Sequence, residues 1–139
     1  MAKLGDFATD LNKERDGIWF RYHGSDFECR IARIGNPNFE GAKRRALRDE
    51  KVRRAVEGGL TVKESKHALA PLVAEYILVD WRGLEDDDGN PLPYSIEKAT
   101  EMLRDDRYRD VYDWVLNQAN NGDFFLATEA EDAETVGNS

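Results

Sequence analysis

The spacing of apolar residues divides the chain into a polar beginning, a β-favouring segment and a long helical part. Residues 1–16 are mostly polar, with Leu4, Phe7 and Leu11 spaced three and four apart, which is typical of either a weak amphipathic helix or an irregular arm. Residues 18–22 form a β-favouring run, and residues 27–31 alternate between apolar and charged side chains. Residues 23–26 supply turn chemistry between them. The pattern therefore predicts a β-hairpin over residues 17–34.

The helical part is predicted to begin with a long basic helix followed by an apolar one. Asn36 and Pro37 are typical of a cap and a first helical position, so we predict a helix over 37–57, ending at 58–59 and fraying or bending past Asp49. Thr61 and Glu64 match a capping box. The helix that they start is predicted to continue through the apolar positions as far as residue 81. A proline at position 71 predicts either a kink or the start of a second helix.

The last third of the chain contains a loop and two further helices. Residues 83–95 carry several turn signals, and Ser95 is the expected cap of a short helix with Ile96, Ala99 and Leu103 on one face. A final helix over 108–119 is predicted to end at 121–122. Because an isolated hairpin is marginally stable, it must pack on the helices. We expect an α+β fold, mostly α, with the N-terminal β-hairpin on a bundle of four to five helices.

This reading gives one globular domain and a tail. The domain spans 1–126, with the arm or weak helix at 1–16, the hairpin at 17–34 and the helical part at 37–122. Residues 127–139 are acidic without any basic residue and are predicted to be disordered.

The charge distribution limits the classes of partner. The net charge is −8, but residues 1–60 carry 13 Lys and Arg against 10 Asp and Glu, whereas residues 61–139 carry 7 against 18. General nucleic-acid binding needs a positive field, so we expect no nucleic-acid partner. No apolar run reaches the roughly 20 residues of a membrane helix, so no membrane partner is expected either. A single cysteine, Cys29, fits a reducing cytoplasm.

The sequence contains no recognisable enzyme or metal motif. His23 and His67 have no ligand partners at zinc-binding spacing. Residues 85–88 are acidic, but the calcium-loop register would place Leu84 at the first ligand position, so they are interpreted as a solvated loop. We therefore expect no catalytic residue, no metal and no cofactor, and a protein that is not an enzyme.

Two groups of residues are candidates for partner binding. The first group lies on the predicted basic helix, where positive charge is concentrated. One hypothesis is that Arg44, Arg48 and Lys51 form a docking surface for an acidic or amphipathic partner. The alternatives are a solvated helix face and nucleic-acid binding. Trp81, Phe124 and Phe125 are the aromatic candidates, since such residues anchor interfaces, although they are also ordinary core residues.

Four segments, in order, resemble the tail assembly chaperones of long-tailed phages. They are residues 35–39 with the basic helix after them, residues 79–84 followed by 88–95, the hairpin before Asn36, and residues 103–115 around 108–110. The resemblance covers residues 17–120. It implies a chaperone that binds the tape measure protein, keeps it soluble and helps to recruit tail tube subunits before it is displaced. It transfers no catalytic residue.

The resemblance also implies where and with what the protein works. Its partners would be the tape measure protein, the tail tube protein and further copies of this chain. It would act in the cytoplasm of the infected bacterial host and be absent from the mature virion. The alternative is a structural virion subunit, such as a head–tail connector or a tail-tube accessory protein. A regulatory binding module, such as an acidic mimic of nucleic acid, is a third hypothesis.

Overall fold

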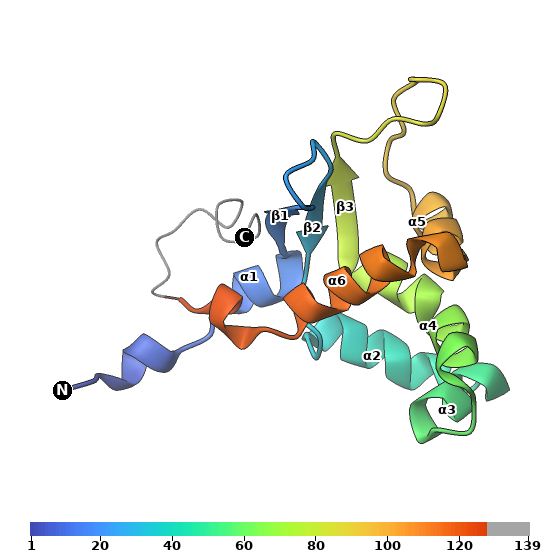
Figure 1. Ribbon diagram of the computed structural model, residues 1–139. Coiled ribbons are helices and arrows are strands. Elements are labelled where there is room, and N and C mark those ends of the chain that lie inside the picture. The colour runs from blue at the N-terminus through green and yellow to red at the C-terminus, as the bar shows by residue number, and fades with distance from the viewer. Residues whose placement is uncertain (128–139) are drawn as a thin grey trace.

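The computed structural model describes residues 1–127, which fold into a small antiparallel sheet packed on helices (Figure 1). The predicted α+β, mostly α class is confirmed. The α-helices and strands, in order, are α1 (Leu11–Asp16), β1 (Ile18–Arg21), β2 (Glu28–Ile31), α2 (Pro37–Ala46), α3 (Glu50–Glu57), α4 (Val62–Tyr76), β3 (Leu78–Arg82), α5 (Ile96–Arg104) and α6 (Arg109–Ala119). Short 3-10 helices are η1 (Leu4–Phe7), η2 (Asp106–Tyr108) and η3 (Gly122–Phe125). The tail that the sequence predicts to be disordered lies, from residue 128 onward, outside the described residues.

The predicted hairpin is present, but it belongs to a sheet with a third strand. β1 and β2 are antiparallel, with Ile18 opposite Ile31 and Phe20 opposite Cys29. β3 pairs antiparallel with the other edge of β2, so the strand order is β1-β2-β3. A third strand gives the hairpin the additional pairing that two strands alone lack in water.

The prediction of one helix running to Trp81 is wrong, because α4 ends at Tyr76. The last helical bond runs from the Ile77 amide to the Val73 carbonyl, at 3.1 Å. The Ile77 carbonyl then accepts from the Ala32 amide at 2.8 Å. The apolar run after Tyr76 satisfies helical spacing as well as strand alternation, and hydrogen bonds from β2 decide in favour of the strand.

The predicted helix over 37–57 is divided into α2 and α3 at Asp49. The Asp49 carboxylate accepts from the amides of Lys51 at 2.9 Å and Val52 at 3.2 Å, so it caps a new helix. The expected bend past Asp49 is therefore a full break. Together with α1, this raises the number of α-helices in residues 1–127 to six instead of four to five.

Pro71 lies inside α4 without starting a second helix. Proline has no amide hydrogen, so the carbonyl four residues earlier, that of His67, lacks its helical donor. The Arg104 side chain on α5 supplies one, with Nε 3.0 Å from the His67 oxygen. This contact satisfies a carbonyl that Pro71 leaves free and joins α4 to α5.

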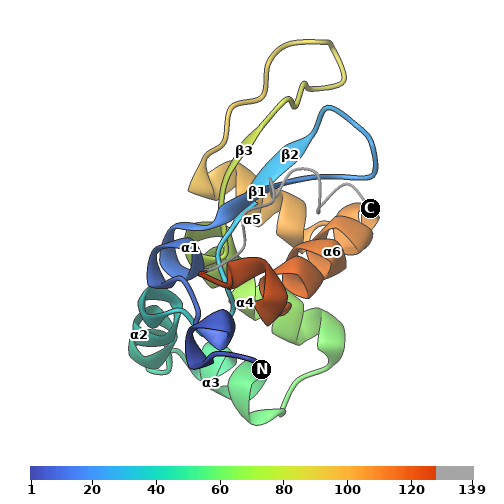
Figure 2. The ribbon, with the colours of Figure 1, turned by 90° about the vertical axis from the view of Figure 1, so that its left-hand side faces the viewer.

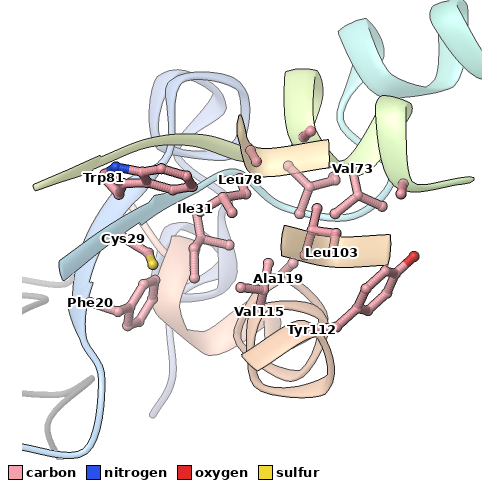
Figure 3. Close-up of a cluster of buried hydrophobic side chains, with 14 of the residues drawn as sticks. Phe20, Cys29, Ile31, Val73, Leu78, Trp81, Leu103, Tyr112, Val115 and Ala119 are labelled. Carbon is pink, nitrogen blue, oxygen red and sulfur yellow. The ribbon is translucent and has the colours of Figure 1, made fainter. Parts of the chain in front are cut away.

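The core lies between one face of the sheet and helices α4, α5 and α6. Figure 3 shows the strand side chains directed toward those of the helices. The buried residues include Phe20, Cys29, Ile31, Leu78 and Trp81 from the strands and Val73, Leu103, Tyr112, Val115 and Ala119 from the helices. This arrangement places the strand ends and the loop after β3 next to α5.

The N-terminal segment is held at one side by the segment after α6. The Asp10 amide donates to the Phe125 carbonyl at 2.7 Å, and the Ala127 amide donates to the Ala8 carbonyl at 2.8 Å. Both sequence alternatives for residues 1–16 are partly right, since η1 and α1 are short helical turns separated by an extended stretch. Leu4, Phe7 and Leu11 are exposed in the described chain.

The buried Tyr112 and the half-buried Tyr94 predict that the fold loses stability at alkaline pH. Burial raises the pKa of both Tyr94 and Tyr112 from the ordinary value of 10 to about 12, with the negative charges of Asp80 and Asp113, respectively, adding to the shift. Their hydroxyls donate to the carbonyls of Ala74 and Lys66. A pKa raised in the folded state means that the protonated form stabilises the fold below about pH 10 and that this contribution is lost as pH rises to about 12.

We expect the urea concentration at the midpoint of unfolding to decrease as the pH is raised from about 10 to about 12. The double variant Tyr94→Phe/Tyr112→Phe should show a shallower fall, and Tyr108→Phe serves as the control because the Tyr108 side chain is exposed. An equal fall in the double variant and the wild type would show that other groups cause the alkaline loss.

Candidate partner-binding groove

A groove of about 560 Å³ lies between the strand ends, the loop after β3, and the α5–η2 segment. Figures 1 and 2 both show this loop extending beyond the ends of the strands. The groove is lined by Tyr22, Phe27, Trp81, Leu84, Glu85, Asp86, Asp87, Leu92, Lys98, Glu101, Met102, Asp105, Arg107, Tyr108 and Val111. Its volume falls within the range of binding pockets in proteins.

The floor of the groove is apolar and built on the core. Trp81 is only 5% exposed, and its ring packs edge-on against Phe27 at 6.2 Å and Tyr94 at 5.3 Å between ring centroids. Met102 and Val111 are half-buried on the helical side. Because Trp81 and Phe27 belong to the core, the floor is rigid, while the half-buried side chains offer apolar surface to a partner.

The loop wall is held in place by hydrogen bonds. The Trp81 Nε1 donates to the Leu92 carbonyl at 2.8 Å, and the Leu92 amide donates to the Leu84 carbonyl at 2.9 Å. Farther out, the Asp86 carboxylate accepts from the amides of Asp88 at 3.0 Å and Asn90 at 2.9 Å. The acidic loop is exposed to solvent, as predicted, and its hydrogen bonds also give it a defined shape as a wall of the groove.

The opposite wall carries paired charges. Lys98 lies 3.3 Å from Glu101, and Arg107 lies 2.7 Å from Asp105, measured between side-chain nitrogen and oxygen atoms. The hydrogen bonds from the Arg107 side chain hold the pKa of Asp105 below its ordinary value. Tyr108, which is 40% exposed, adds an accessible aromatic ring at this edge. The arrangement suits non-covalent docking of an amphipathic segment, because an apolar floor is bordered by polar walls.

The basic residues proposed from the sequence lie on a different surface. Arg44 on α2, Arg48 between the helices and Lys51 on α3 are all exposed, and among residues 1–127 none of them forms a salt bridge. Figures 1 and 2 both place α3 at the end of the molecule opposite the loop after β3. Arg44, Arg48 and Lys51 remain candidates for partner binding. We use the name basic face for the exposed basic residues of α2, α3 and the turn between them, which are Arg44, Arg45, Arg48, Lys51, Arg53 and Arg54.

The three aromatic candidates, Trp81, Phe124 and Phe125, pack in or against the hydrophobic core. Phe125 is fully buried, and Phe124 is half-buried with its ring 5.0 Å from that of Phe20. Trp81 lines the groove and is 5% exposed. Partner binding through Trp81, Phe124 and Phe125 stays a prediction. Because Trp81 and Phe125 are buried, we expect them to act mainly by supporting the surface around them.

Sequence reasoning missed the half-buried residues that make the groove, chiefly Leu84, Leu92, Met102 and Val111, and the exposed Tyr108. A signal was present, since Leu84 and Leu92 stand on either side of the acidic turn and are natural stem residues. Their meeting with Met102 and Val111 depends on how the strands pack on α5 and α6.

Cys29 and Ser25 carry nucleophilic side chains, and both are engaged in the fold. Burial raises the pKa of the Cys29 thiol, so the thiolate that a nucleophile needs is disfavoured. Ser25 donates its hydroxyl to the Tyr22 carbonyl inside the turn. Within residues 1–127, no group of three or more histidine, cysteine or acidic side chains is placed to hold a metal ion. No helix in that part has the length and apolar content to cross a membrane.

Comparison with known protein families gives a match. The family described as YdaY prophage protein matches residues 34–138. The chain belongs to the YdaY prophage protein family. It is therefore a phage-derived protein. The YdaY match begins after β2 and includes β3, the loop wall, α5 and α6, which provide most of the groove. No curated protein and no solved structure matches the chain.

Proposed function

We propose that this protein is a tail assembly chaperone that binds the tape measure protein of its phage. The observation that carries the proposal is the groove, which has an apolar floor between two polar walls. Phage origin and the resemblance of four ordered segments to tail assembly chaperones supply the context. A tape measure protein is long, helical and apolar, so it needs its apolar surface covered before the tube forms.

The groove suits a partner that must later be released. An amphipathic helix inserts apolar side chains at positions i, i+3 and i+4 into such a groove. A single short segment gives moderate affinity, and several chaperones along one tape measure would protect it through many weak contacts. The net negative charge of the chaperone keeps the complex in solution. Displacement by tube subunits then requires only small free-energy changes at each site.

The basic face is proposed as a second contact, for the tail tube protein. It lies far from the groove, so both contacts can form at once. In this proposal the protein catalyses no reaction, works in the cytoplasm of the bacterial host and is absent from the mature virion.

Co-expression with the tape measure protein encoded near this gene tests the proposal. We expect the soluble fraction of the tape measure protein to rise severalfold and the two chains to purify together. The measurement is the amount of tape measure protein in the supernatant and in the pellet, with and without this chain. No rise and no co-purification would sink the proposal, and detection of the chain in purified particles would then favour a structural subunit.

Two matched variants locate the effect. Tyr108 borders the groove and Ile96 does not, yet both side chains are 40% exposed. Truncating an aromatic contact residue to alanine commonly costs about 1–3 kcal/mol of binding free energy. Tyr108→Ala should therefore lower the soluble fraction, whereas Ile96→Ala should leave it unchanged. Equal results for the two variants would move the binding surface away from the groove.

A further inference from the structure

The two walls of the groove differ in charge. Glu85, Asp86 and Asp87 line the loop wall, and no basic residue lines that side. The opposite wall holds Lys98 with Glu101 and Arg107 with Asp105, each pair within 3.3 Å, so its charges cancel. Within the described residues, the carboxylates of the loop wall form no salt bridge. The negative potential in the groove is therefore concentrated along one side.

The carboxylates of the loop wall are not equivalent. The Asp86 carboxylate accepts hydrogen bonds from two backbone amides inside the loop. Glu85 and Asp87 are exposed. On the opposite wall, the pKa of Arg107 is raised chiefly by its hydrogen bond to Asp105, and the negative charge of Asp87 adds a smaller contribution. Both Glu85 and Asp87 line the groove. Glu85 and Asp87 are thus the two acidic groups available to a bound segment.

We propose that the groove selects an amphipathic segment with lysine or arginine along one flank only. Its apolar stripe would contact the floor, its basic flank would face Glu85 and Asp87, and its other flank would be uncharged and face α5. This inference rests on the proposed function and adds the chemistry of the partner. It also fixes the direction in which the segment lies, because reversing it would turn the basic flank toward the neutral wall.

Synthetic helical peptides of about 18 residues, or five turns, test the rule. All carry the same leucine stripe; the first has lysines on one flank, the second has glutamines on both flanks, and the third has lysines on both. Exposed ion pairs are individually weak, so we expect the first peptide to bind about 3–10 times tighter than the second. The third should gain no more than about twofold over the first, since the α5 wall is neutral.

Fluorescence anisotropy of labelled peptides measures these affinities at low and high ionic strength. The variant Glu85→Gln/Asp87→Asn should bind the first and second peptides equally. The control Glu57→Gln/Glu75→Gln makes the same change of net charge at exposed residues that do not line the groove, and it should keep the preference. High salt should reduce the preference in the wild type.

The outcomes separate this rule from the chaperone proposal. Equal binding of the first two peptides to the wild type overturns the charge rule and leaves the apolar groove intact. Loss of the preference in the Glu57/Glu75 control overturns it too, because net charge alone would then explain the binding. Failure of every peptide to bind overturns the groove as the site, and the co-expression experiment judges the chaperone function independently.

Discussion

Replacing Trp81 by alanine is expected to destabilise the whole fold rather than to weaken partner binding selectively. The indole is almost fully buried between Phe27 and Tyr94, and its Nε1 anchors the Leu92 carbonyl at 2.8 Å. Truncating a buried aromatic residue costs about 3–5 kcal/mol of unfolding free energy. The total free energy of unfolding of a small domain is only about 5–15 kcal/mol. The midpoint of unfolding should therefore shift to a much lower urea concentration. Urea unfolding followed by circular dichroism measures it.

Trp19→Ala is the matched control for that experiment. Trp19 precedes the core-facing Phe20 on β1, so it lies on the other face of the sheet, where it is half-buried with the Arg82 guanidinium 4.1 Å above its ring centroid. Its loss should cost about 1–2 kcal/mol, from a cation–π contact and partial burial. If Trp81→Ala kept wild-type stability but lost the tape measure protein, Trp81 would be a contact residue after all.

Gly83→Ala is expected to be nearly as damaging, for a steric reason. Gly83 has φ of +73°, and a Cβ atom there would lie 1.9 Å from the Asp26 carbonyl oxygen. The left-handed conformation costs a residue with a side chain about 1–2 kcal/mol. Relieving the overlap requires the β1–β2 turn to move, and overpacking of this kind adds about 1–3 kcal/mol. The same urea titration should therefore show a loss of about 2–5 kcal/mol.

Gly24→Ala separates the two contributions. Gly24 has almost the same φ, +72°, but a Cβ there would meet no atom within 4 Å. Only the conformational cost of about 1–2 kcal/mol should appear. Equal losses in the two variants would show that the turn yields freely and that the close approach of Gly83 to Asp26 does not stabilise the fold.

The candidate site was predicted less well than the fold. Exposure of Arg44, Arg48 and Lys51 follows from charge on a helix, and the structure places these residues in solvent. The aromatic residues could not be assigned in this way from the sequence. Trp81 and Phe125 suit a core and an interface equally well until their neighbours are known. The groove depends on Leu84, Met102 and Val111, which come from three separate segments, and no local pattern relates them.

The sequence by itself determined the elements that depend on neighbours along the chain. Asn36, Thr61 and Ser95 each accept an amide of the turn that follows, so the starts of α2, α4 and α5 were predictable. The turn between β1 and β2 follows from local chemistry in the same way.

The tertiary structure decided the elements that need distant partners. Leu78 to Arg82 became a strand because β2 offers it hydrogen bonds, and α4 continues through Pro71 because Arg104 reaches the His67 carbonyl. The acidic loop became a wall because Trp81 holds the Leu92 carbonyl. Capping and turn energies act within about four residues and can be read along the sequence. Strand pairing, the replacement of a missing helical donor and the shape of a groove join residues that only the folded chain brings together.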